Sequence, residues 1–185
     1  MDNGARLYQR FLDGDDSGLE ELVKLYNVNL VFYINGFVCN VAVSEDIAAE
    51  TFAKLVTRKI RFKNDYAFKT WLFKIARNNA IDYLRRQSRW RLNPIEDLRT
   101  DPADQEILEN VILKNEQNKQ LHSTMQTMHN DYRDILHLIY FEEMSYAEAA
   151  KILAKSVRQI KNLAYRARQA LKSALERDGF VYENI

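Results

Sequence analysis

The sequence is poor in the two residues that turns use most. Its 185 residues include only five glycines and two prolines. Turns depend heavily on these residues, so the composition favours an almost entirely helical fold. The apolar share of 46% is sufficient for a packed core and argues against disorder. The length suits one large domain or two small ones.

Cysteine and long apolar runs are scarce as well. The single cysteine, Cys39, excludes an internal disulfide and fits a reducing, cytoplasmic compartment. Because Cys39 lies in an apolar stretch, we expect it to belong to the core. The N-terminus has no apolar signal core, and no segment approaches the roughly 20 apolar residues of a membrane span. We therefore expect a soluble cytoplasmic protein with no direct membrane insertion.

Motifs for catalysis and cofactor binding are also missing. The sequence contains no glycine-rich phosphate loop, nucleophile elbow or pair of catalytic carboxylates. His122, His129 and His137 lie in one region, but no carboxylate or cysteine stands at ligand spacing to them. We expect a protein that is not an enzyme, uses no cofactor and has no metal site.

The charge of the chain is balanced overall but divided into blocks. Residues 57–91 hold 11 Lys and Arg against 2 Asp and Glu, and residues 145–177 hold 8 against 2. Residues 92–118, between them, hold 2 basic and 7 acidic residues. Two separate basic surfaces suggest a polyanion that is contacted at two places. Charge alone equally allows two solvated helical faces.

Hydrophobic periodicity predicts an all-α protein with two small helical domains, residues 1–91 and 119–185, joined by a flexible acidic linker, residues 92–118. In the first domain a turn is expected at residues 13–16. A helix is expected to begin at Ser44, whose side chain can cap free backbone N–H groups.

Residues 145–171 have the layout of a helix-turn-helix. Ser145 with Glu148 forms one potential capping box, and Ser156 with Gln159 forms another. The intervening residues around Ala154 have the length of the tight turn. Small and apolar residues are spaced to pack the two helices together, at Ala150, Leu153, Val157 and Ile160.

The second helix of this motif is predicted to present a polar face to DNA. Its first turn would meet base edges, and its later Arg and Lys residues would meet phosphates. A helical hairpin with a basic, solvated face is the alternative. The residues expected on this face are Arg158, Gln159, Lys161, Asn162, Tyr165, Arg166 and Arg168.

The segment 66–91 combines aromatic and aliphatic residues with many arginines. Its apolar positions keep helical spacing, so one face is expected to be core. Basic residues interleaved with aromatics suit unpaired DNA, whose bases stack on aromatic rings. Asn78 on the other face can donate and accept hydrogen bonds and is suited to contact an extruded base. A core helix with a charged outer face is the alternative.

Four stretches, in order, resemble the extracytoplasmic-function (ECF) sigma factors of bacterial RNA polymerase. FKTWLFKIARNNAIDYLRR resembles the promoter-melting segment of that family, and SEDIAAETFAKLV resembles its polymerase-clamp helix. MQTMHNDYRDILHLIYFEEMSYAEAAKIL and SVRQIKNLAYRARQALK resemble the helices around and within its promoter-reading motif. The resemblance covers about residues 5–91 and 119–177. It implies a protein that recruits core RNA polymerase to promoters and helps to melt the −10 region.

The resemblance also implies roles for individual residues. The exposed side of 44–56 would bind the beta-prime clamp helices through Glu45, Asp46, Glu50 and Thr51, and Leu136 and Ile139 would contact the beta flap. Asn78 would capture a flipped −10 base, supported by the preceding loop from Phe62 to Phe68 and by Lys69, Arg77 and Asp82. Arg85, Arg86 and Arg89 would hold the nearby phosphates. The −35 element would be docked by the polar face of the second helix of the helix-turn-helix. Family members are often held by an anti-sigma factor, which is a further expected partner.

Three positions depart from the family pattern. His129 replaces a usual proline, Ala149 a usual isoleucine and Ala154 a usual turn glycine. The two alanines could loosen the packing of the helix-turn-helix, and none of the three lies on the DNA-facing side. Two rival functions remain open from the sequence. One is a helix-turn-helix regulator that binds duplex DNA without polymerase, and the other is a helical adaptor with no nucleic-acid role.

Overall fold

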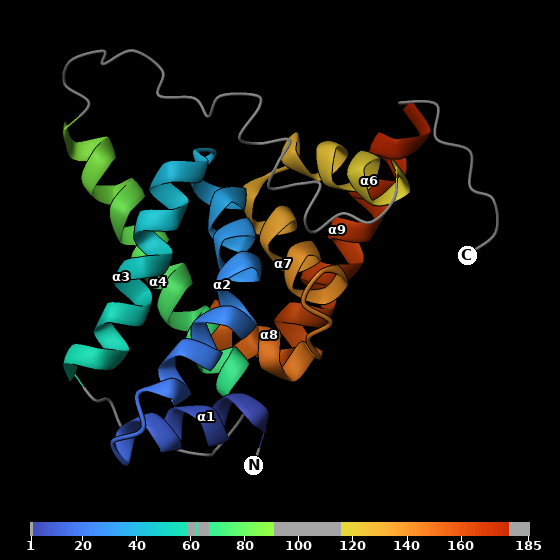
Figure 1. The fold of residues 1–185 in the computed structure, drawn as a ribbon. Helices are drawn as coiled ribbons and strands as arrows, with labels where there is room; N and C mark the ends of the chain where they lie inside the picture. Colours follow the sequence, from blue (N-terminus) through green and yellow to red (C-terminus); the bar gives the residue numbers. More distant parts are fainter. Residues whose placement is uncertain (1, 59–61, 63–66, 91–115, 178–185) are drawn as a thin grey trace. The chain divides into compact units, whose positions relative to one another are not determined.

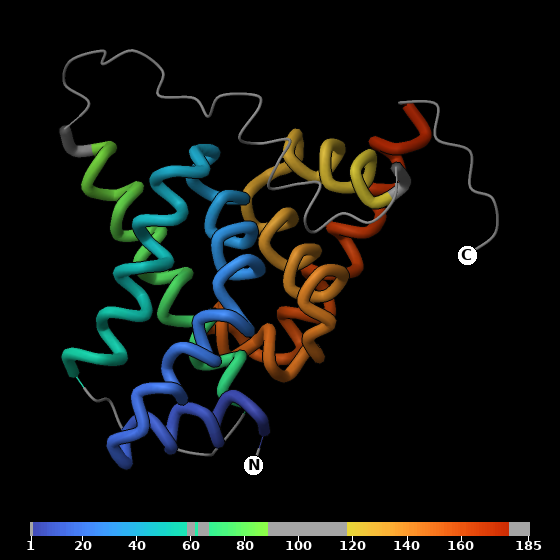
Figure 2. The backbone as a smooth tube through the Cα atoms, viewed as in Figure 1, coloured from blue at the N-terminus to red at the C-terminus, as the bar shows by residue number. Residues whose placement is uncertain are grey.

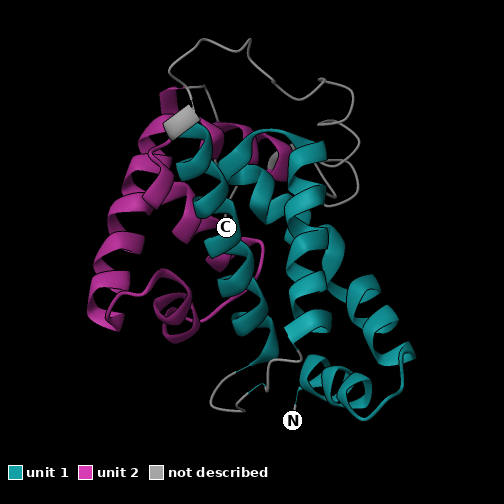
Figure 3. Ribbon diagram, turned by 90° about the vertical axis from the view of Figure 1, so that its left-hand side faces the viewer, with its two compact units in different colours: residues 1–112 teal, residues 113–185 magenta. Residues whose placement is uncertain are grey.

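The structure, a computed structural model, describes residues 2–58, 62, 67–90 and 116–177, and the side chains of residues 89, 90, 116 and 117 are not described. Every regular element in this part of the chain is a helix, which confirms the all-α prediction. The chain forms two compact units, residues 1–112 and 113–185, called the first and second unit below (Figure 3). The predicted linker lies outside the described residues except for 116–118, which begin a helix.

The first unit consists of α1 (Asn3–Leu12), α2 (Ser17–Val38), α3 (Val41–Arg58) and α4 (Phe68–Trp90). Figures 1 and 2 show α2, α3 and α4 running side by side in alternating directions, with α1 across one end. Each long helix contributes one apolar face to the shared core. Fully buried leucines from α2, α3 and α4, namely Leu30, Leu55 and Leu72, belong to it.

The two ends of α1 are fixed by local interactions. Asp2 accepts hydrogen bonds from the backbone N–H of Ala5 (2.8 Å) and of Phe68 (2.6 Å), so one carboxylate caps α1 and holds the start of α4. The predicted turn at residues 13–16 is confirmed, with Gly14 at φ +99°. Beyond it, Gly18 allows α2 to approach α1 closely, since a Cβ there would lie 2.5 Å from the carbonyl oxygen of Leu7.

An aromatic cluster joins α1 to α4. The ring of Tyr8 lies 5.3 Å from that of Phe68 and 5.6 Å from that of Trp71, and Phe62 lies 5.4 Å from both of the latter rings. Tilted and edge-on ring pairs at these separations contribute stability in addition to that from burying their apolar surface. Tyr26 of α2 completes the cluster, and burial, assisted by the negative charge of Asp2, raises the pKa of Tyr26 to about 12.

Two predictions about the α2–α3 connection are wrong. The helix α3 begins at Val41, because Asn40 accepts a hydrogen bond from the N–H of Val43 (2.9 Å) and takes the capping role expected for Ser44. The Ser44 side chain is buried and donates to the carbonyl oxygen of Asn40 (2.7 Å). Cys39 is exposed, not core, because it ends α2 in the left-handed conformation (φ +53°) and turns away from the apolar face.

The second unit consists of α6 (Glu116–Gln126), α7 (Asn130–Tyr140), α8 (Tyr146–Leu153) and α9 (Val157–Arg177). The helices α7 and α9 each contact all the other helices of the unit. The longer of the two is α9. Its apolar stripe includes Ile160 and Ala164, which are fully buried.

The start of α7 and the region after it are held by polar side chains. The ring Nδ1 of His129, which stands where a proline is usual, accepts the N–H of Asp131 at 3.3 Å and caps α7. His137 is buried with its Nε2 3.5 Å from Glu142 Oε1, and burial lowers its pKa although Glu142 opposes the shift. Helical spacing did not predict this pair, because Glu142 lies two residues beyond the end of α7. No group of three metal-ligating side chains is arranged for a metal ion within the described residues.

Candidate nucleic-acid and polymerase interfaces

The outer face of α4 combines an exposed amide with exposed guanidinium groups. Asn78, Arg85 and Arg86 are exposed, and Arg77 is half-buried. Asp82 forms an ion pair with Arg85 at 3.0 Å, with both side chains 60% exposed. At that exposure the pair contributes little stability, about 0–1 kcal/mol, so Arg85 remains available to a phosphate. The next residue, Asn79, is buried instead and contacts Thr51 of α3.

The two other residues predicted for this surface are a half-buried lysine and an arginine whose side chain is not described. Lys69, near the start of α4, is half-buried with its ammonium 5.6 Å from the centre of the Phe73 ring, within the range of a cation–π contact. The side chain of Arg89 lies outside the described residues, as does most of the segment between Phe62 and Phe68.

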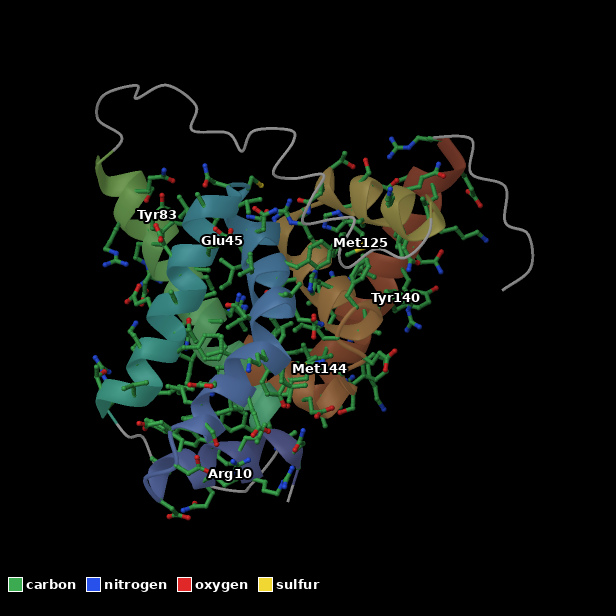
Figure 4. All side chains as sticks on the ribbon, in the orientation of Figure 1. Arg10, Glu45, Tyr83, Met125, Tyr140 and Met144 are labelled. Carbon is green, nitrogen blue, oxygen red and sulfur yellow. The ribbon has the colours of Figure 1, made fainter. Side chains whose placement is uncertain are left out.

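The outer face of α3 carries three exposed acidic residues, Glu45, Asp46 and Glu50. Figure 4 places Glu45 on α3 beside Tyr83 of the adjacent helix α4. The prediction that Thr51 shares this outer face is wrong, because its side chain is fully buried. Its hydroxyl donates to the carbonyl oxygen of Ile47 at 2.8 Å and accepts from the amide nitrogen of Asn79 at 2.8 Å.

A sequence signal for the burial of Thr51 was present. Ile47, Thr51 and Leu55 are spaced by four residues and therefore lie on one face of α3. One partner of Thr51, Asn79 on α4, was missed because nothing in the sequence pairs positions 28 residues apart. Asn79 has a second partner on α3, Lys54, whose ammonium donates to the carbonyl oxygen of the Asn79 amide at 2.5 Å.

The helix-turn-helix prediction is confirmed in its geometry. Ser145 and Glu148 form a reciprocal capping box at the start of α8. Ser156 and Gln159 form a second box at the start of α9, with backbone–side chain distances of 2.8 and 3.2 Å. Ala154 occupies the turn in the left-handed conformation (φ +52°), where a glycine is usual.

One of the residues predicted to pack the two helices of the motif together is not buried. Ala150, Leu153 and Ile160 are buried as expected, but Val157 is 42% exposed. It is the first residue of α9. Ala149 is fully buried, so a residue smaller than the family's usual isoleucine is accommodated in the core.

The exposed side of α9 presents a row of polar side chains. Tyr165, 62% exposed, is the most exposed large hydrophobic residue that the structure describes. Arg168 also holds the motif together, because its guanidinium donates to the Tyr146 hydroxyl at 2.8 Å and connects α9 to α8. All seven residues predicted for this face are exposed: Arg158, Gln159, Lys161, Asn162, Tyr165, Arg166 and Arg168.

The apolar residues predicted to contact the beta flap differ in exposure. Leu136 is fully buried and Ile139 is half-buried, so only Ile139 presents part of its side chain. The neighbouring Tyr140, labelled in Figure 4, is 46% exposed at the end of α7. None of the helices described here combines the length and the apolarity needed to cross a membrane.

Comparison with known proteins accounts for both units. Residues 22–90 match Sigma-70 region 2, and residues 118–171 match Sigma-70, region 4. The RNA polymerase sigma-H factor of Pseudomonas aeruginosa is 31% identical over 95% of this chain and 95% of its own length. This chain belongs to the ECF RNA polymerase sigma factors. As a sigma factor it directs the initiation of transcription, and a regulator that acts without polymerase is not favoured.

Other relatives agree with this assignment of the sigma factor. The ECF sigma factor SigM of Bacillus subtilis is 28% identical over 86% of this chain and 96% of its own. Among solved structures, CnrH in complex with the cytosolic domain of CnrY has the same fold (TM-score 0.70, 24% identity, 96% of this chain and 99% of that chain). RpoE of Bartonella quintana in complex with the anti-sigma factor NepR is also similar (TM-score 0.61, 21% identity, 83% and 94%).

Proposed function

We propose that the first unit of this sigma factor performs two tasks on two adjacent helices. The outer face of α3, with Glu45, Asp46 and Glu50, binds the clamp helices of the polymerase beta-prime subunit. The outer face of α4 receives unpaired −10 DNA, with Asn78 capturing a flipped base. The exposed Asn78 amide beside Arg85 and Arg86, on a helix whose other face is core, is the observation on which this assignment depends. An amide that offers a donor and an acceptor matches the hydrogen-bonding edge of an unpaired base.

The second unit is proposed to dock the −35 element through α9. The start of α9 is closed by a capping box that keeps its first turn regular, and the polar row that follows is exposed. In a helix-turn-helix this is the end of the recognition helix that enters the major groove. Ile139 and Tyr140 at the end of α7 are proposed to contact the beta flap. The protein acts in the cytoplasm, as a DNA-binding factor and not as an enzyme.

Gel filtration with bacterial core RNA polymerase tests the polymerase interface. The wild-type protein is expected to co-elute with the core enzyme, and a variant with Asp46→Lys and Glu50→Lys is expected to elute separately. A matched control, Asp13→Lys with Asp16→Lys, reverses two exposed acidic residues at the α1–α2 turn and should co-elute like wild type. Retention of binding by the α3 variant, or equal loss in the control, would contradict the proposed interface.

An anti-sigma factor is a further proposed partner. The Bartonella quintana protein with the same fold was solved with such a factor bound. Affinity purification of the tagged sigma factor from its native cells, followed by mass spectrometry, tests the proposal. Recovery of a polypeptide that competes with core polymerase for the purified protein is the expected result, and its absence from cells that express the sigma factor would contradict it.

A further inference from the structure

A chain of polar contacts, buried at Thr51 and Asn79 and half-buried at Lys54, connects α3 to α4 next to the proposed base-capturing residue, Asn78. Asn79, 7% exposed, donates from its amide nitrogen to the Thr51 hydroxyl at 2.8 Å and accepts the Lys54 ammonium at 2.5 Å. The Thr51 hydroxyl donates onward to the Ile47 carbonyl oxygen at 2.8 Å. Lys54 also pairs with Glu50 at 2.9 Å.

These contacts allow only one orientation of the Asn79 amide. The hydroxyl proton of Thr51 is committed to the α3 backbone, so Thr51 can only accept from Asn79. Lys54 carries donors only, so it must face the amide oxygen. A flipped amide would set its NH2 group against the ammonium and its oxygen against the hydroxyl oxygen. Polar groups left without partners at this site would lower the stability of the fold, so the contacts specify one orientation of the Asn79 amide.

Apolar packing alone would not fix α4 in the same way. The hydrophobic effect is not directional, so burial alone tolerates small rotations of a helix about its axis. Hydrogen bonds with paired donors and acceptors allow less rotation. A buried polar contact that specifies register is a documented use of such groups.

The rotation of α4 sets the position of the neighbouring residue, Asn78. Side-chain ends lie roughly 6 Å from a helix axis, so a rotation of about 10° would move the Asn78 amide by about 1 Å. A displacement of that size can cost up to about 100-fold in a process that depends on alignment. Lys54 adds a second link, because the same ammonium contacts Asn79 and the proposed polymerase contact Glu50.

We propose that Asn79, held by Thr51 and Lys54, is a positioning residue that aims Asn78 at the flipped −10 base and ties this aim to the polymerase-binding helix. The proposal rests on the proposed role of Asn78. It assigns to α3 a function in promoter opening that is separate from its binding of polymerase.

The decisive comparison uses two substitutions at one buried position. Thr51→Val keeps the shape of the side chain but removes the hydroxyl, and Thr51→Ser keeps the hydroxyl. Asn79→Leu removes the amide, and Ile34→Val, a buried change on α2 outside the chain of hydrogen bonds, serves as a control for loss of stability. Each full-length variant is combined with core polymerase. The DNA probe is a promoter fragment selected from a random-sequence library by the wild-type holoenzyme and labelled with 2-aminopurine in its −10 region.

Two readouts, the rate of open-complex formation and the Kd for core polymerase, separate positioning from folding. Thr51→Val is expected to form open complex about tenfold more slowly, with its Kd for core polymerase unchanged within twofold, and Thr51→Ser is expected to open like wild type. Asn79→Leu should match or exceed the defect of Thr51→Val. Opening by Thr51→Val at the wild-type rate would overturn the proposal, as would an equal defect in Thr51→Ser or in an equally destabilised Ile34→Val.

Failure of the proposed function of Asn78 gives a different result from failure of the positioning role of Asn79. If Asn78 does not contact the −10 base, Asn78→Ala opens the promoter at the wild-type rate. The positioning role fails separately if Asn78→Ala is defective while Thr51→Val and Asn79→Leu are not.

Discussion

Replacing Ala154 by glycine should stabilise the second unit. Ala154 ends α8 at φ +52° and ψ +44°, where its N–H bonds to the carbonyl oxygen of Ala150. A Cβ in this conformation costs about 1–2 kcal/mol, which glycine avoids. Glycine also gives the unfolded chain more freedom, at a cost of about 0.4–1 kcal/mol. The difference is a net gain of about 0.5–1 kcal/mol in the free energy of unfolding.

The gain can be measured because the two units have different reporters. Both tryptophans, Trp71 and Trp90, belong to the first unit. Tryptophan fluorescence therefore follows the unfolding of the first unit alone, and calorimetry follows both. For a domain of 60–100 residues, 0.5–1 kcal/mol corresponds to a rise in Tm of about 2–8 °C. Only the calorimetric transition of the second unit should rise.

A matched substitution in the same unit should have the opposite sign. Ala170 lies within α9, so Ala170→Gly should lower the free energy of unfolding by about 1 kcal/mol. If Ala154→Gly lowered the Tm of the second unit, or changed it as Ala170→Gly does, the strain assigned to the turn would be refuted.

Further predictions concern stability, pH and salt. Gly18→Ala should destabilise the first unit by about 1–3 kcal/mol, because the added Cβ would meet the α1 backbone. Gly36→Ala should stabilise the unit by up to about 1 kcal/mol, because the added Cβ would have no atom within 4 Å. Urea unfolding measures both changes. The pKa of Tyr26 is raised to about 12, so the unfolded state loses the phenol proton first, and stability should fall as pH rises from about 10 to 12. Tyr26→Phe should make that fall shallower in unfolding measured across this range. In holoenzyme–promoter binding, Lys161→Glu or Arg166→Glu should reduce the slope of log K against log salt by about one unit per phosphate contact removed, and an unchanged slope would exclude the contact.

The features predictable from sequence were those set by short spacing. The two capping boxes of the helix-turn-helix need partners only three residues apart, and both form as predicted. The division of α4 into a core face with Asn79 and an outer face with Asn78 follows from helical periodicity. The family itself followed from four such stretches in order.

The features that sequence did not reveal depend on competition between neighbours or on contacts across helices. Asn40 and Ser44 are both good capping residues, and the backbone turn at Cys39 decided in favour of Asn40. Cys39 has apolar neighbours in sequence, yet a left-handed backbone exposes it. The hydrogen bond between Thr51 and Asn79 joins positions that no periodicity relates.

The second capping box limits what Gln159 can offer to DNA. Its side-chain carbonyl oxygen accepts the N–H of Ser156 at 2.8 Å, so the box holds this oxygen at the start of the helix and leaves the NH2 group free of the box. The paired donor and acceptor with which glutamine recognises adenine are therefore divided between the helix and the groove. A free NH2 group suits the acceptor edges of guanine or thymine. This box is closed by a neutral glutamine, and the first turn of α9 contains no acidic residue. The positive end of the α9 helix dipole is therefore not offset where the helix faces the negatively charged DNA.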